Sequence, residues 1–209
     1  LPVLSARGGI FMFDEFKRNF KESFERFSVL ENLVLAGMLC ALGIAISTAA
    51  GLMPVLPKYM KLGLGSVSKR CTGYLLGPAV SIAAAFVTDI VGYFLNPASG
   101  TFFIGFTLNE MLAGFIYGVA FYNKKLTILR ILVANIIIML LCNLLINTAL
   151  MEYMGYGKFA VLIGPRTVKN LIMLPVNTMI FYLLGPALVH IKKKMSSRKM
   201  IKRKSHAEI

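Results

Sequence analysis

Apolar residues in this sequence fall into long runs separated by short polar segments rich in glycine and proline. The runs cover about 33–53, 79–95, 105–122, 127–151 and 165–191. Each approaches the ~20 residues that a helix needs to cross a hydrocarbon core. A shorter segment at about 62–76 contains Lys69 and Arg70, and Gly77-Pro78 separates it from the next run. We count it as a further span and predict six transmembrane helices, the last one opening at Pro165 in its first turn.

A stripe of phenylalanines precedes the first span. Phe13, Phe16, Phe20, Phe24 and Phe27 are spaced three or four residues apart, with basic and acidic residues between them. That spacing predicts an amphipathic helix lying in the membrane interface. Packing of the stripe against a partner protein is the alternative. The chain thus divides into an interfacial segment at 1–31, a six-helix domain at 32–191 and a basic tail at 192–209.

The composition supports a membrane protein. Apolar residues make up 57% of the chain and charged residues 15%, whereas soluble domains average about 25% charged residues. The net charge of +14 does not indicate nucleic-acid binding, because eight of the 23 Lys and Arg residues lie in the tail and most others flank apolar runs. Their distribution predicts a multi-pass, all-α protein of the bacterial cell membrane with both termini cytoplasmic.

Polar residues inside the predicted spans gather at one depth. The expected topology places charged or amide side chains in the outward half of the membrane. They are Asp89, Glu110, Asn143, Asn147, Arg166, Lys169 and Asn170. Because an isolated charge at the bilayer centre costs ~2.5–3.5 kcal/mol on insertion scales, such residues usually face a cavity or one another. We predict a polar cavity open to the outside. The alternative is that Asp89 and Glu110 only pair internally with Lys69, Arg70 or Lys169.

Aromatic residues lie next to the predicted cavity. The segment from Gly100 to Phe106 contains Phe102 and Phe103, and we expect it to form a glycine-hinged flap, with Tyr93 nearby on the preceding span. Simple anchoring of these rings at the membrane interface is the alternative.

Catalytic signatures do not occur in the sequence. It has no HExxH, DDxxD, GxSxG or Walker motif, and Cys40, Cys71 and Cys142 occur singly without metal-ligand spacing. We therefore expect neither an enzyme nor a cofactor or metal site. Any ATP-driven step requires another subunit.

Four sequence blocks carry a resemblance to a known family. Over residues 33–188 the chain resembles the folate-specific substrate-binding (S) component of energy-coupling-factor (ECF) transporters. The blocks are Gly77-Pro78, Asp89-Ile90-Val91-Gly92, the stretch from Pro97 to Leu108 with its Gly-Phe-Thr-Leu end, and Pro165-Arg166-x-x-Lys169-Asn170-Leu171-Ile172-Met173-Leu174-Pro175. The departure is Val67-Ser68-Lys69-Arg70, where this branch often has a more apolar segment with a proline.

The resemblance implies a function and partners. It implies a six-helix bundle that binds a vitamin from outside and joins a transmembrane scaffold subunit and two ATPases. It also implies that a stripe of small residues on the first span, here Ala41, Ala45 and Ala49, docks on the scaffold. Small residues at this spacing also serve ordinary helix packing.

Folate chemistry suits the polar residues independently. The amino-pyrimidine edge of the pterin offers two parallel donors to one carboxylate, Asp89 or Glu110. The aromatic residues suit the ring system. The glutamate dianion suits Arg166, Lys169, Lys158 or Lys61, the first two near the positive end of the last helix. The alternatives are an S component for another vitamin, or a structural or assembly protein whose buried charges form internal ion pairs.

Overall fold

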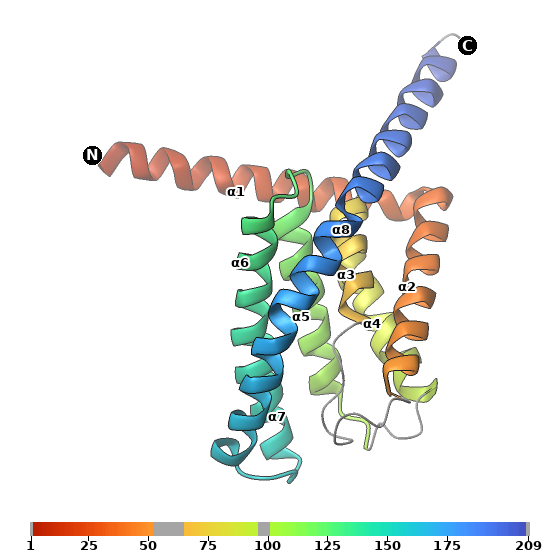
Figure 1. The fold of residues 1–209 in the computed structure, drawn as a ribbon. Coiled ribbons are helices and arrows are strands. Elements are labelled where there is room, and N and C mark those ends of the chain that lie inside the picture. Colours follow the sequence, from red (N-terminus) through yellow and green to blue (C-terminus); the bar gives the residue numbers. More distant parts are fainter. Residues whose placement is uncertain (1, 52–64, 96–100, 208–209) are drawn as a thin grey trace.

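The computed structural model describes residues 2–51, 65–95 and 101–207, and these residues form helices and turns without a strand. The elements are α1 (Pro2–Glu25), the 3₁₀ turn η1 (Arg26–Ser28), α2 (Leu30–Gly51), α3 (Ser66–Leu76), α4 (Pro78–Leu95), α5 (Ile104–Phe121), α6 (Ile128–Ile138), the π-helix η4 (Met139–Ile146), α7 (Asn147–Tyr153) and α8 (Phe159–Ala207). They form one bundle crossed at its end by α1 (Figure 1).

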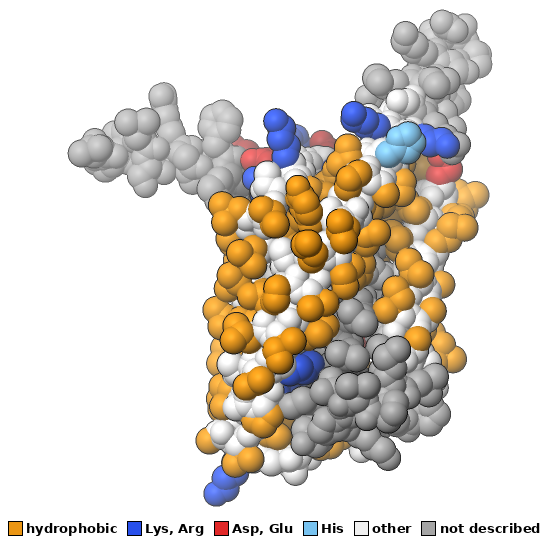
Figure 2. Space-filling view, in the orientation of Figure 1, with side chains coloured by type: hydrophobic (Ala, Val, Ile, Leu, Met, Phe, Trp, Pro, Cys, Tyr) orange, Lys and Arg blue, Asp and Glu red, His pale blue; other side chains and the backbone are white. Residues whose placement is uncertain are grey.

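Five segments of the described chain are long and apolar enough to cross a membrane. They are α2, α4, α5, the continuous α6–η4–α7 segment and α8. On the face seen in Figure 2, apolar side chains cover most of the described surface along the bundle, and basic side chains gather at the end where α1 lies. The predicted all-helical membrane fold is confirmed.

The sixth predicted span corresponds to α3, which has only 11 residues. At ~1.5 Å per residue it is too short to cross a membrane by itself, and residues 52–64 before it lie outside the described residues. The count of six therefore stays a prediction. α3 is buried by other helices, with Leu75 and Leu76 fully enclosed. Because protein rather than lipid surrounds it, α3 can carry Lys69 and Arg70.

The last helix corrects one prediction. α8 begins at Phe159, so Pro165 lies inside the helix and not in its first turn. The helix begins early because the carboxylate of Glu152 accepts a hydrogen bond from the Phe159 N–H at 3.0 Å, which satisfies one of the free donors of the first turn. α8 then continues without a break into the basic tail at 192–207.

The helix α1 lies at the same end of the bundle as the C-terminal turns of α8 (Figure 1). Its phenylalanine stripe is divided. Phe16 meets Phe115 of α5 edge-on at 5.9 Å. Phe27, which lies in η1, packs against the core, whereas Phe24 is 66% exposed. The side chain of Phe13 lies outside the described residues. Part of the stripe thus covers the protein's own bundle, and the interfacial placement of α1 stays a prediction.

A single hydroxyl fixes α1 to the break between α3 and α4. The Ser23 hydroxyl donates to the Leu76 carbonyl at 2.8 Å and accepts from the Ala79 N–H at 3.0 Å. Gly77 between them has a φ of +91°, and a Cβ there would lie 2.7 Å from the Ser23 side chain. Only glycine fits this conformation and approach. The break sets the direction of both α3 and α4, which carry much of the site described next.

Candidate substrate-binding cavity

A cavity of about 500 Å³ lies inside the bundle and is lined by all the membrane-embedded helices. This volume falls in the range of small-molecule sites. All eleven residues predicted to bind substrate line it, although their binding role stays a prediction. They are Asp89, Tyr93, Phe102, Phe103, Phe106, Glu110, Asn143, Asn147, Arg166, Lys169 and Asn170.

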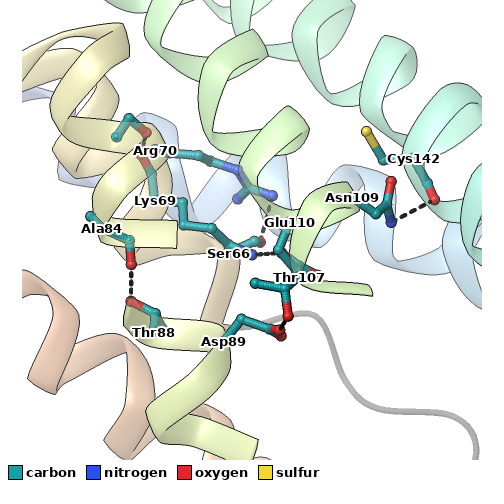
Figure 3. A network of polar contacts seen from close by, with 11 residues as sticks. Ser66, Lys69, Arg70, Ala84, Thr88, Asp89, Thr107, Asn109, Glu110 and Cys142 are labelled. Carbon is teal, nitrogen blue, oxygen red and sulfur yellow. Dashed lines mark hydrogen bonds and ion pairs between the residues drawn. The ribbon is translucent and has the colours of Figure 1, made fainter. Parts of the chain in front are cut away.

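The two predicted acids have different partners. Glu110 of α5 forms an ion pair with Lys69 of α3, the only ion pair among the described residues. This contact is the one that the internal-pairing alternative expected for Glu110, and a role of Glu110 in substrate binding stays a prediction. The Asp89 carboxylate of α4 accepts a hydrogen bond from the Thr107 hydroxyl at 2.7 Å and has no ion-pair partner in the described part of the chain. Figure 3 shows both contacts side by side at the wall formed by α3, α4 and α5.

The basic residues of α8 form another wall. The guanidinium of Arg166 donates through Nη2 to the Asn143 carbonyl at 3.3 Å and contacts the Met151 sulfur through Nη1. Its Nε is buried without a hydrogen-bond partner. No carboxylate within the described ranges pairs with Arg166. A partly buried cation without a counter-charge favours an anionic ligand.

The electrostatic reason given for Arg166 and Lys169 needs correction. Because α8 starts at Phe159, Arg166 is beyond its first turn, and the dipole effect falls off within that turn. The attraction for an anion must come from the two side-chain charges. Of the other bases considered for this role, Lys158 is exposed and does not line the cavity, and Lys61 lies outside the described residues.

Aromatic rings line the cavity near the start of α5. Tyr93 meets Phe102 at 5.1 Å and Phe103 meets Phe106 at 6.0 Å between ring centroids, both edge-on. Residues 104–106 of the segment expected to form a flap belong to the first turn of α5. Gly100 lies outside the described residues, and a flap at 101–103 stays a prediction. Gly105 is not a hinge. A Cβ there would lie 2.4 Å from the Phe103 ring, so this glycine allows the ring to pack closely.

Sequence reasoning left the role of Arg70 open, and the structure places it at the cavity wall. Arg70 is 2% exposed. Its guanidinium donates to the Asn177 carbonyl at 3.1 Å and to the Ser66 hydroxyl at 2.9 Å, and it lies 5.1 Å above the Tyr117 ring. The neighbouring Lys69 turns instead to Glu110 because adjacent helical residues point about 100° apart. The adjacent charges of Lys69 and Arg70 in an otherwise apolar segment were the sequence feature that could have indicated a place at the cavity.

Amide side chains that the sequence analysis missed also line the cavity. Asn109 donates to the Cys142 carbonyl at 3.1 Å, and its own carbonyl oxygen is buried without a partner. Asn135 accepts from the Tyr117 hydroxyl at 3.4 Å and donates to Thr178 at 2.9 Å. Cys142 lies in the π-helix η4, a distortion frequent at functional sites. Single amides in apolar runs gave no signal because interhelical contacts produce the same pattern.

The predicted docking stripe lies on the outer face of α2. Ala41, Ala45 and Ala49 are all exposed, and a Cβ at Gly37, one turn earlier, would meet nothing within 4 Å. The opposite face of α2 packs against α3, where a Cβ at Gly43 would lie 2.7 Å from Ser68. The stripe is therefore not needed for packing within the described bundle.

A membrane-embedded helical bundle around a cavity with acidic, aromatic and basic walls defines a solute-binding membrane protein. The sequence comparison identifies its family. Residues 31–185 match the family described as ECF transporter, substrate-specific component, so the chain belongs to this family. The resemblance seen in the sequence is confirmed. The protein is a transporter component and not an enzyme.

Individual relatives carry a more specific name. A protein from Clostridium novyi (strain NT), named Folate transporter FolT, is 34% identical over 123 residues, which cover 59% of this chain and 71% of that protein. A Folate transporter FolT from Leuconostoc mesenteroides subsp. mesenteroides is 30% identical, with 78% and 90% covered. A solved structure described as FolT bound with folic acid has a TM-score of 0.68 and 28% identity, covering 76% of this chain and 94% of its own.

Proposed function

We propose that this chain is the folate-binding component of an ECF transporter and that folate binds in the 500 Å³ cavity. The observation that supports this most directly is which charged side chains of the cavity have an ion-pair partner and which do not. Among the described residues, the carboxylate of Asp89 and the guanidiniums of Arg70 and Arg166 have no ion-pair partner. Arg70 is bound by Asn177 and Ser66, so we assign the anionic end of the ligand to Arg166. Folate carries a donor edge at one end and a dianion at the other, and both relatives and a solved neighbour are named for folate transport or binding.

Asp89 is the residue that we assign to the pterin. One carboxylate can accept two parallel N–H groups of the amino-pyrimidine edge. Glu110 is less suited because its charge is already matched by Lys69. Thr107 holds the Asp89 carboxylate through one oxygen at 2.7 Å, and this leaves the other oxygen and further lone pairs for the ligand.

Arg166 and Lys169 are the residues that we assign to the glutamate carboxylates. The Nε of Arg166 is a buried donor without a partner, and a bound carboxylate would satisfy it. Tyr93, Phe102, Phe103 and Phe106 would then pack on the flat ring system between the two ends.

The partners follow from the family. We propose that the exposed face of α2 with Ala41, Ala45 and Ala49 docks on a transmembrane scaffold subunit, which is joined by two ATPases. The exposure of all three alanines supports this assignment, because small residues allow close helix approach.

We also propose that the protein lies in the bacterial cell membrane with both termini cytoplasmic. The excess of basic side chains at the α1 end supports that orientation (Figure 2).

Titration calorimetry of the purified chain tests this function. Folate, folinate and methylfolate are compared with thiamine, riboflavin and biotin. We expect saturable one-to-one binding of folates and none of the other vitamins. Binding of another vitamin instead would support a different S component, and no binding of any vitamin by a folded chain would support the structural-protein alternative.

A further inference from the structure

A second hollow lies on the outside of the bundle, between α5 and α6. It is a groove of about 400 Å³ whose lining includes Ile116, Ala120, Lys124, Arg130, Val133 and Ile137. It shares no lining residue with the substrate cavity. Val133 and Ile137 are 47% and 45% exposed, so the groove faces the surroundings of the bundle, which in a membrane are lipid.

The groove has a basic end and an apolar length. Lys124 lies in the α5–α6 turn and Arg130 in the first turn of α6, at the same end of the bundle as α1 (Figure 1). Isoleucine, valine and alanine side chains line the part that runs along the two helices. The lining contains no Asp or Glu, so its formal charge is +2 from Lys124 and Arg130.

Each of the two basic side chains donates one hydrogen bond to a backbone carbonyl and keeps further N–H donors for a ligand. The Lys124 ammonium donates to the Val119 carbonyl at 3.3 Å, and the Arg130 guanidinium donates to the Lys125 carbonyl at 2.9 Å. These bonds hold the two cations at the groove mouth. Lysine has three donors and arginine five, so each retains donors for an anion.

We propose that this groove binds one anionic phospholipid, with the phosphate on Lys124 and Arg130 and an acyl chain along α5 and α6. The charge and the apolar length both support this occupant. Basic pockets between transmembrane helices bind anionic head groups, whereas the apolar wall of Val133 and Ile137 would contribute nothing to a soluble phosphate. A zwitterionic lipid of the same chain length would gain only the apolar part.

Native mass spectrometry of the purified full chain in detergent tests the proposal. Phosphatidylglycerol is compared with phosphatidylcholine of identical acyl chains. The test variant is Lys124→Gln/Arg130→Gln. The matched control is Lys125→Gln/Lys193→Gln, which removes two exposed charges that do not line the groove. Thermal unfolding and folate binding of each variant check that the fold is intact.

We expect the wild type and the control to retain one phosphatidylglycerol in preference to phosphatidylcholine. The test variant should lose about thirty-fold in affinity for phosphatidylglycerol, or about five-fold for each single substitution. An equal loss in the control would overturn the proposal, because diffuse surface charge would then explain binding. Equal retention of both lipids, or displacement of the lipid by glycerol phosphate at similar concentration, would also overturn it.

Discussion

Replacing Lys169 by alanine tests the assignment of the basic wall. If Lys169 binds a glutamate carboxylate, the substitution removes one charge-assisted hydrogen bond, worth ~1.5–3 kcal/mol. At ~1.4 kcal/mol for each factor of ten, folate affinity should fall about ten- to a hundred-fold. We expect a loss toward the lower end, because Arg166, one turn earlier, stays in place with its unpartnered Nε.

The comparison of two ligands separates this effect from general damage to the cavity. Pteroate in the form of its primary amide keeps the pterin and benzoyl rings but has no carboxylate. It should bind the wild type more weakly than folate and lose little further affinity in Lys169→Ala. Calorimetry on the four protein–ligand combinations gives the coupling between the side chain and the glutamate.

Lys158→Ala provides the control. Lys158 lies in the loop directly before α8, the helix that carries Lys169. Its side chain is exposed and does not line the cavity. The control removes the same charge and should leave the affinity for folate within about two-fold, because exposed charges are screened. Our reasoning is refuted if Lys169→Ala weakens both ligands equally, or if Lys158→Ala matches it.

Further predictions concern the acids and the outer face of α2. Asp89→Asn should weaken folate and the pteroate amide by the same factor, about ten-fold or more, and calorimetry that shows a loss for folate alone would contradict the pterin assignment. Glu110→Gln should lower the free energy of unfolding by about 1–3 kcal/mol, less than the ~3–5 kcal/mol of a fully buried pair. The double variant with Lys69→Met should recover most of this stability in thermal unfolding, and no recovery would show that the ion pair is not the cause. Ala41→Trp or Ala45→Trp should abolish folate uptake by cells and leave folate binding by the purified chain intact. Equal loss of uptake and binding would show that the stripe supports the fold instead.

The long spans could be predicted from the sequence because lipid exposure demands continuous apolar residues. The limits expected for α2, α4 and α5 agree with the structure to within a few residues. The start of α8 could not be predicted from its own residues. It depends on Glu152, which caps Phe159 from the preceding helix, and on the turn at Gly155 and Gly157, whose φ angles are positive.

The charged cavity residues and the pair Asn143 and Asn147 could be predicted, because charges, and amides one helical turn apart, seldom occur in an apolar run without a polar partner. The single amides Asn109 and Asn135 could not.

The pairing of the charged residues could not be predicted. The sequence places Asp89 and Glu110 at similar depth, and only the direction of α3 decides that Lys69 meets Glu110. That direction depends on the break between α3 and α4 at Gly77. Ser23 of α1, which is far away in the sequence, packs against Gly77 and hydrogen-bonds to the Leu76 carbonyl.

The outer and inner faces of α2 show how one pattern can have two meanings. Small residues recur every three or four positions on both faces, with Ala36, Cys40 and Gly43 on the inner face. The sequence alone could therefore not separate packing from docking. On the inner face, Gly43 approaches Ser68 so closely that a Cβ would clash at 2.7 Å. On the outer face, Ala41 and Ala45 are exposed and Gly37 has open space around it. A tryptophan at Gly43 should therefore disrupt the bundle, whereas one at Ala41 has room in the isolated chain. Loss of uptake by the Ala41 variant with folate binding intact would therefore point to another protein that approaches this face.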